Sequence, residues 1–181
     1  IMGAGALAGL ISVETATPSD ATELNVAMGL ENYGGRRLEV SGNTPITSAL
    51  SARIAHQRYE SDGWVDNTFL GVNDTNNRDE QTSRLALRHV IDANTVDIKL
   101  NKVDVKNGYD AFSLDNTRET LSDQPGEDSL ELTSMLVRWN RVGERFTSTV
   151  QVSDVDADAI YSYDEDWSFV GIRPFWEYSS F

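Results

Sequence analysis

The sequence predicts an all-β fold, a partial antiparallel transmembrane β-barrel built as a meander of hairpins with about seven strands. Three observations predict this fold class. Apolar and polar residues alternate with a period of two, the period of a strand with one apolar face. The predicted strands are about 10 residues long, which is enough to cross a bilayer at a tilt. The connections between them alternate between short and long, as in outer-membrane barrels.

The clearest strand is the segment 22–33. Its polar face, which includes Glu23 and Asn25, is expected to contact water. Its apolar face carries Leu24, Val26, Met28 and Leu30. The same alternation predicts six further strands, at 36–43, 48–59, 82–91, 95–105, 130–140 and 146–154.

The connections separate the two ends of the predicted sheet. Short turns are expected at Gly34-Gly35, Pro45, 92–94 and 141–144, because glycine and proline interrupt strands. Long polar loops are expected over 61–80 and 107–128, and a third long acidic segment is expected from Asp156 onward. All long connections then lie at one end of the sheet. Aromatic residues near the strand ends, namely Tyr33, Tyr59, Trp64 and Trp139, predict interfacial girdles.

One segment weakens the prediction of a barrel. In 130–140, Leu132 and Leu136 fall on one face, whereas Met135 and Val137 fall on the other. A soluble, acidic β-sandwich that binds a ligand would show the same alternation elsewhere, and it remains the alternative. An apolar face that stays apolar in every strand at membrane depth would favour the barrel.

The composition excludes several functions. The 181 residues carry a net charge of −14, which argues against nucleic-acid binding. There is no cysteine, so a disulfide framework and a cysteine nucleophile are excluded. The two histidines, His56 and His89, lie in the middle of predicted strands without a catalytic partner nearby, so we expect wall residues and no enzyme.

Two motifs suggest ligands that their surroundings do not support. Residues 3–8 fit the loose dinucleotide fingerprint, but no strand precedes them and a strand is expected at 10–15. Asp154, Asp156 and Asp158, with Glu165, match part of an EF-hand loop, but Ala159 stands where glycine is required. We therefore expect no cofactor and no built metal site. A looser external cation site that includes Asp164 or Asp166 stays an open hypothesis.

Several motifs, taken in order, resemble the TonB-dependent receptors of bacterial outer membranes. Residues 3–11, GAGALAGLI, look like the end of that family's plug domain, and residues 29–37, GLENYGGRR, are similar to its first barrel hairpin. Residues 62–67, DGWVDN, resemble the opening of the second external loop. Residues 107–116 and 122–126 resemble the third loop of a subgroup of iron-complex receptors. The second turn departs from the family, with Asn43-Thr44-Pro45 in place of Gly-Pro.

The resemblance implies a fragment of a larger plugged barrel of about 22 strands. Residues 1–17 would be the end of the plug, and residues 22–181 the first part of the barrel. The implied function is import of a scarce nutrient, most simply a ferric chelate, across the outer membrane of a Gram-negative bacterium. The implied partners are membrane lipid, the small-molecule nutrient and the TonB energy-coupling complex, which would act through a segment absent from this chain.

In such a receptor the external loops recognise the ligand. The candidate ligand-binding residues are aromatic side chains in the predicted loops, which can stack on a ligand: Trp64, Tyr109, Phe112 and Trp167.

Overall fold

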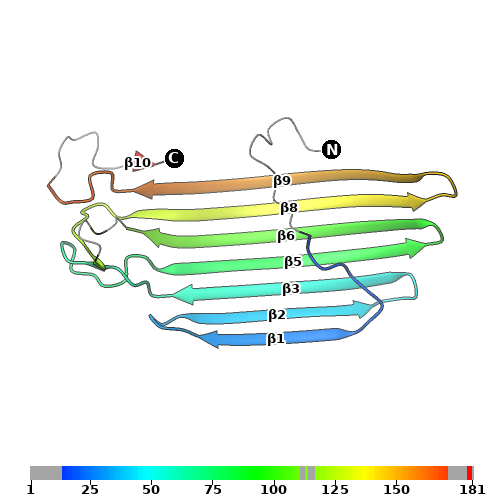
Figure 1. Cartoon of the computed structure of the whole chain (residues 1–181), viewed down its shortest axis with the longest axis horizontal. Helices are drawn as coiled ribbons and strands as arrows, with labels where there is room; N and C mark the ends of the chain where they lie inside the picture. The colour runs from blue at the N-terminus through cyan, green and yellow to red at the C-terminus, as the bar shows by residue number, and fades with distance from the viewer. Residues whose placement is uncertain (1–13, 111–112, 114–116, 171–178, 181) are drawn as a thin grey trace.

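The computed structural model describes residues 14–110, 113, 117–170 and 179–180. Every regular element in these ranges is a strand. Seven long strands form one antiparallel sheet (Figure 1). They are β1 (Glu23–Leu30), β2 (Arg36–Pro45), β3 (Leu50–Ser61), β5 (Arg78–Ile91), β6 (Asn94–Tyr109), β8 (Gly126–Val142) and β9 (Thr147–Tyr163). Three strands of two residues complete the set: β4 (Asp66–Asn67), β7 (Glu119–Thr120) and β10 (Ser179–Ser180).

The strands follow one another in chain order, β1-β2-β3-β5-β6-β8-β9-β10, without a crossover. All seven long strands were predicted, and the meander of hairpins is confirmed. The described sheet is open, because β1 pairs only with β2 and β9 pairs beyond β8 only with the short β10. The long connections lie together at one end, beside the short β1–β2 turn, and the other short turns lie at the opposite end (Figure 1).

The third acidic segment was predicted wrongly as a loop from Asp156 onward. Strand β9 continues through Asp156 and Asp158 to Tyr163 and pairs with β8 over this whole length. The alternation in fact continues here, because the acidic residues share one face while Val155, Ala157 and Ala159 share the other. Strands β6 and β8 also extend beyond their predicted ends on the same side of the sheet.

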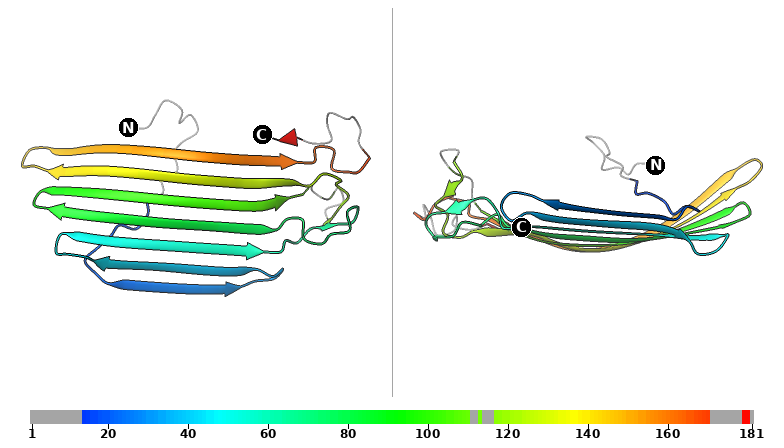
Figure 2. Two further views of the ribbon diagram at one scale, coloured as in Figure 1. Left: turned by 180° about the vertical axis from the view of Figure 1, so that it is seen from behind. Right: turned by 90° about the horizontal axis from the view of Figure 1, so that it is seen from below.

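The register assigns each residue to a face, since directly opposed residues point the same way. Leu38, Ile54 and Leu100 share a face with Val137 and Val152. This face is convex, because the edge-on view in Figure 2 shows residues 14–22 on the concave side and Lys99, from the opposite face, bonds Thr15 there. The concave face is mostly polar and carries, among others, Glu39, Arg53, Arg84, Lys99, Asn101, Arg138 and Gln151.

The register also places the ambiguous residues of β8. Met135 and Val137 belong to the convex apolar face, opposite Leu100 and Ile98. Leu136 lies on the concave face opposite Lys99, close to the segment that precedes β1. The apolar residues of β8 therefore lie on both faces: Met135 and Val137 in the uncovered apolar face, and Leu136 near residues 14–17.

The described residues contain almost no buried apolar core. Val65, in a loop, is the one buried hydrophobic residue that they provide. By contrast, Met28 and Val152 on the convex face are 81% and 65% exposed. A β-sandwich buries apolar side chains between two sheets, whereas the apolar face of this sheet is uncovered.

Residues 14–22 cross the concave face of the sheet before β1 begins (Figure 2). Lys99 Nζ donates a hydrogen bond to Thr15 Oγ1 at 3.1 Å. The buried Asn43 side chain accepts from the Ser19 backbone N–H and donates to the backbone oxygens of Ser19 and Ala21. Of the strand expected at 10–15, the described residues Glu14 and Thr15 are not in a strand, and the remainder lies outside the described ranges, as does most of the expected plug end at 1–17.

The concave face contains a charged pair that is shielded from water. Arg88 Nε and Asp97 Oδ1 lie 2.7 Å apart, and a second bond joins Arg88 Nη2 to Asp97 Oδ2 at 2.9 Å. The Asp97 side chain is nearly buried. We predict that Arg88→Ala lowers the free energy of unfolding by about 2 kcal/mol, because it leaves this carboxylate unpaired.

Urea unfolding of the full-length protein measures this effect. The matched control is Arg58→Ala, because Arg58 contacts Glu60 with both side chains about half exposed. An exposed ion pair contributes less than about 1 kcal/mol. Equal losses in the two variants would contradict the prediction.

Candidate membrane-facing surface and outer loop cluster

The convex apolar residues form a band that runs obliquely across the sheet. Directly opposed residues on successive strands form a row across the sheet. The row that begins at Met28 and Leu38 continues with Arg58, Gln81, Asp104, Glu131 and Asp158. Three rows nearer the short turns, the row is Ala52, Leu87, Ile98, Val137 and Val152. The upper edge of the band therefore moves from the row of Leu38 on β2 to the row of Val152 on β9.

This displacement gives the angle between the apolar band and the rows of paired residues. From Asp158, which shares the row of Leu38, to Val152 the shift is six residues over the five steps from β2 to β9. At about 3.4 Å per residue and 4.8 Å per strand, the band makes an angle of roughly 40° with the rows. Strands of outer-membrane barrels are tilted from the membrane normal by about 35–45°. A horizontal apolar belt would produce this oblique pattern on such strands.

The height of the band agrees with the same interpretation. On β8 the first polar convex residues on either side of the band are Arg141 and Thr133, eight residues apart. At a tilt of roughly 40° this length spans about 21 Å along the membrane normal, near the ~25 Å apolar belt of outer-membrane barrels. The two histidines also lie on this face, His89 near the lower edge and His56 just above the upper edge, where its Nδ1 lies 3.0 Å from Ser83 Oγ.

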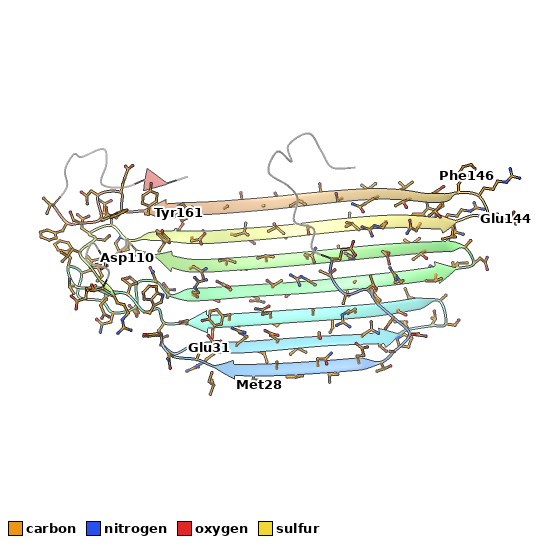
Figure 3. All side chains as sticks on the ribbon, in the orientation of Figure 1. Met28, Glu31, Asp110, Glu144, Phe146 and Tyr161 are labelled. Carbon is orange, nitrogen blue, oxygen red and sulfur yellow. The ribbon has the colours of Figure 1, made fainter. Side chains whose placement is uncertain are left out.

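The predicted aromatic girdles are supported at the short-turn end alone. Trp139 lies on the convex face there, and its indole N–H donates to Asn94 Oδ1 at 3.2 Å. Phe146 is exposed at the adjacent turn (Figure 3). The upper girdle is not formed as expected, because Tyr59 points to the concave face, where its hydroxyl donates to Glu31 and its ring lies against Arg37. Tyr33 contacts Arg118 from a loop instead.

The long connections fold together at the other end of the sheet. We call the described residues of 62–77, 110–125 and 162–170 the outer loop cluster. The first two connections pair through the short parallel strands β4 and β7. The third contacts the first through stacked rings of Phe69 and Phe169, whose centroids lie 4.9 Å apart. Figure 3 shows Asp110 and Tyr161 at this end, opposite Glu144 and Phe146.

Asn67 is the central residue of the outer loop cluster. Its side chain is almost fully buried and donates to Asp110 Oδ2 at 3.0 Å and to the Ser122 carbonyl at 2.8 Å. Its Oδ1 accepts from the Leu70 backbone N–H at 2.9 Å. One side chain therefore connects two loops that are more than 50 residues apart in the chain.

Two positions beside this cluster require glycine, because backbone atoms of another segment lie very close to them. A Cβ atom at Gly126 would lie 1.8 Å from the Ser162 carbonyl oxygen, and one at Gly108 would lie 2.6 Å from that of Thr75. Neither position has room for a larger residue. Both glycines belong to the loop motifs that resemble the iron-complex subgroup.

Three of the four predicted ligand-binding residues lie among the described residues, at the end of the sheet that carries the long connections. Trp64 and Trp167 are both partly exposed in the outer loop cluster, and Trp167 has a positive φ of 60°. Tyr109 is the last residue of β6, and its ring packs edge-on against Tyr161 with centroids 5.2 Å apart. Phe112 lies outside the described residues. The Phe69–Phe169 stack had no signal in the sequence, because its two rings are 100 residues apart in the chain.

Tyr109 lies beyond the apolar band, and its phenol has an altered acidity. A hydrogen bond with Tyr161, together with burial, raises its pKa to about 12 from an ordinary value of 10.0. The folded protein thus favours the protonated phenol. We predict that this contribution to stability is complete below about pH 10 and is lost as the pH rises through about 12.

Ultraviolet difference titration of the tyrosines tests this prediction. Wild-type protein is expected to show one phenol that ionises late, and Tyr161→Phe is expected to remove the delay. A late phenol that persists in Tyr161→Phe would assign it to another tyrosine.

The described part of the chain brings no metal centre together. Asp154, Asp156 and Asp158 lie along β9 on the convex face, opposite Met135, Thr133 and Glu131. Within the described ranges, no three histidine or acidic side chains are placed to hold a metal ion. In these same ranges no helix is long and apolar enough to cross a membrane.

Comparison with known proteins gave no relative. No protein-family model, no curated protein and no solved structure matches the chain.

Proposed function

We propose that this chain is part of the barrel of a TonB-dependent outer-membrane receptor. The observation that carries the proposal is the oblique apolar band on the convex face of the sheet. An apolar face this large and this exposed needs a cover, and lipid is the cover that suits a belt of about 21 Å on strands tilted by roughly 40°. The soluble sandwich would need a second sheet over the same face.

The polar concave face supports the same proposal. In a barrel it would line the lumen, and residues 14–22 already cross it before the first strand starts. A chain that passes from inside the barrel into β1 is the order that a plug followed by a barrel requires. The long connections would then face outward, which agrees with the resemblance of 62–67 and 107–116 to external loops.

Import of a scarce nutrient, with a ferric chelate as the favoured cargo, rests on this resemblance. The outer loop cluster would capture the cargo, and the energy-coupling complex would act through another part of the receptor. Iron starvation is expected to raise the amount of the full-length protein in outer membranes. Cells that lack it are expected to lose uptake of labelled ferric chelates. Unchanged uptake of every chelate would exclude iron and leave other nutrients as cargo.

Single cysteines can test the membrane-facing band directly, because the chain contains no native cysteine. In a cysteine-free version of the full-length protein in lipid vesicles, Val137→Cys is labelled with an environment-sensitive dye. Lipids with nitroxide-labelled acyl chains are expected to quench this dye strongly. The matched control is Leu136→Cys, whose side chain belongs to the concave face.

The two positions are neighbours on one strand, so only the direction of the side chain distinguishes them. Equal quenching at both positions, or quenching at neither, would contradict a lipid-facing convex surface. A dye quenched at Leu136→Cys alone would reverse the assignment of the two faces.

A further inference from the structure

The third connection of the outer loop cluster is held by a buried contact between Asp164 and Ser122. Both residues have a relative exposure of 0%. Ser122 follows β7 in the second long connection, whereas Asp164 follows β9. The contact therefore joins two segments that are 42 positions apart in the sequence. It lies next to Asn67, whose side chain donates to the Ser122 carbonyl.

The hydrogen bonds of this contact are incomplete. Asp164 Oδ1 accepts from the Asp166 backbone N–H at 3.2 Å. Asp164 Oδ2 and Ser122 Oγ are both buried, and neither has a hydrogen bond of ordinary geometry. Leaving such groups unpaired is costly, and an ionised carboxylate costs more than a neutral one.

The charges around the carboxylate increase this cost. Asp166 on the same segment and Asp123 beside Ser122 are the acidic groups that act on Asp164. Asp110 faces the same region from the end of β6 and is bonded to Asn67. Within the described ranges, no lysine, arginine or histidine forms an ion pair with Asp164. Among the residues that the structure describes, no positive charge therefore stabilises the ionised form of Asp164.

One proton would remove the imbalance. The Ser122 hydroxyl can donate to the ionised carboxylate or accept from the protonated one, but only the protonated Asp164 avoids the cost of a buried charge and no longer repels Asp123 and Asp166. We propose that Asp164 is an acid-operated latch that holds the segment after β9 against the Ser122 turn when it is protonated and releases it when it is ionised. The inference does not depend on the cargo or on import.

The direction of the pH dependence follows from the surroundings. Burial raises the pKa of Asp164 more than the nearby Ser122 hydroxyl lowers it, and Asp166 and Asp123 raise it further. A carboxyl whose pKa is raised in the closed state favours closure at low pH. Closure is therefore strengthened as the pH falls through the raised value and weakened as the pH increases above it.

Hydrogen exchange of the full-length protein in lipid vesicles tests the latch. After correction for intrinsic exchange rates, amides of 120–124 and 162–168 are expected to exchange several-fold more slowly near pH 5 than near pH 8. Asp164→Asn is expected to abolish this difference and to exchange slowly at both values. Asp123→Asn is expected to keep the difference but to move its midpoint to lower pH, since it removes one repelling charge.

Three outcomes would overturn the inference. The first is exchange in the wild-type protein that does not depend on pH in these segments. The second is a pH dependence that survives in Asp164→Asn, which would place the titrating group elsewhere. The third is slow exchange near pH 8 on addition of Ca²⁺ alone, reversed by a chelator, because a bound cation and not a proton would then complete the contact.

Discussion

Val137→Arg is expected to lower the free energy of unfolding from a bilayer by about 3 kcal/mol. Val137 lies midway between Thr133 and Arg141, the first polar convex residues on either side of the band on β8. A guanidinium at this depth would have to remain in hydrocarbon or distort the lipid around it. Reversible unfolding of the full-length protein in lipid vesicles measures the change.

The matched control is Ser153→Arg. Ser153 lies on the neighbouring strand β9, is exposed in the described sheet, and belongs to the concave face opposite Leu136, the residue before Val137. We expect a loss below about 1 kcal/mol there, because the arginine remains in water. If both variants lost the same free energy, the convex face could not be the one in contact with lipid.

Asn67→Ala is expected to open the outer loop cluster without unfolding the sheet. The change removes three hydrogen bonds and leaves the buried Asp110 carboxylate and the Ser122 carbonyl without their shared donor. The expected cost is about 3 kcal/mol, which corresponds to roughly 100-fold faster hydrogen exchange in 66–72 and 119–124. Exchange in β5 and β6 near the short turns is expected to stay unchanged.

Asn73→Ala serves as the control for this variant. Asn73 is an exposed asparagine in the same connection, so its loss is expected to change exchange very little. Faster exchange in β5 or β6 of Asn67→Ala would show that the cluster and the sheet open as one unit, contrary to the prediction.

The period of two predicted the strands because each strand has one side in water. This signal gave the start of β2 and the turn after Ile91 correctly. Tyr59 has the parity of Arg53 and Gln57, so its place on the concave face followed from the alternation. The acidic half of β9 has the spacing of a strand, but a run of aspartates is also typical of a loop, so composition and spacing predict different structures there.

The outer loop cluster could not be predicted in the same way. Asn67, Ser122 and Asp164 come from three connections, and no local pattern links them. Their contacts depend on loop paths that only the folded chain defines. Polar loop residues usually face water, so burial of an asparagine and an aspartate at this end had no signal in the sequence.

If the band contacts lipid as proposed, the unequal lengths of band and strand set how far the protein extends beyond the membrane. On β8 the band ends at Met135, but the strand continues nine residues to Gly126. At a tilt of roughly 40° those residues rise about 23 Å, while the headgroup layer adds only about 7 Å on each side of the hydrocarbon. The upper part of the sheet would therefore extend beyond the headgroup layer into the external solution. Molecules arriving from outside would meet the loops well before they reached the membrane surface.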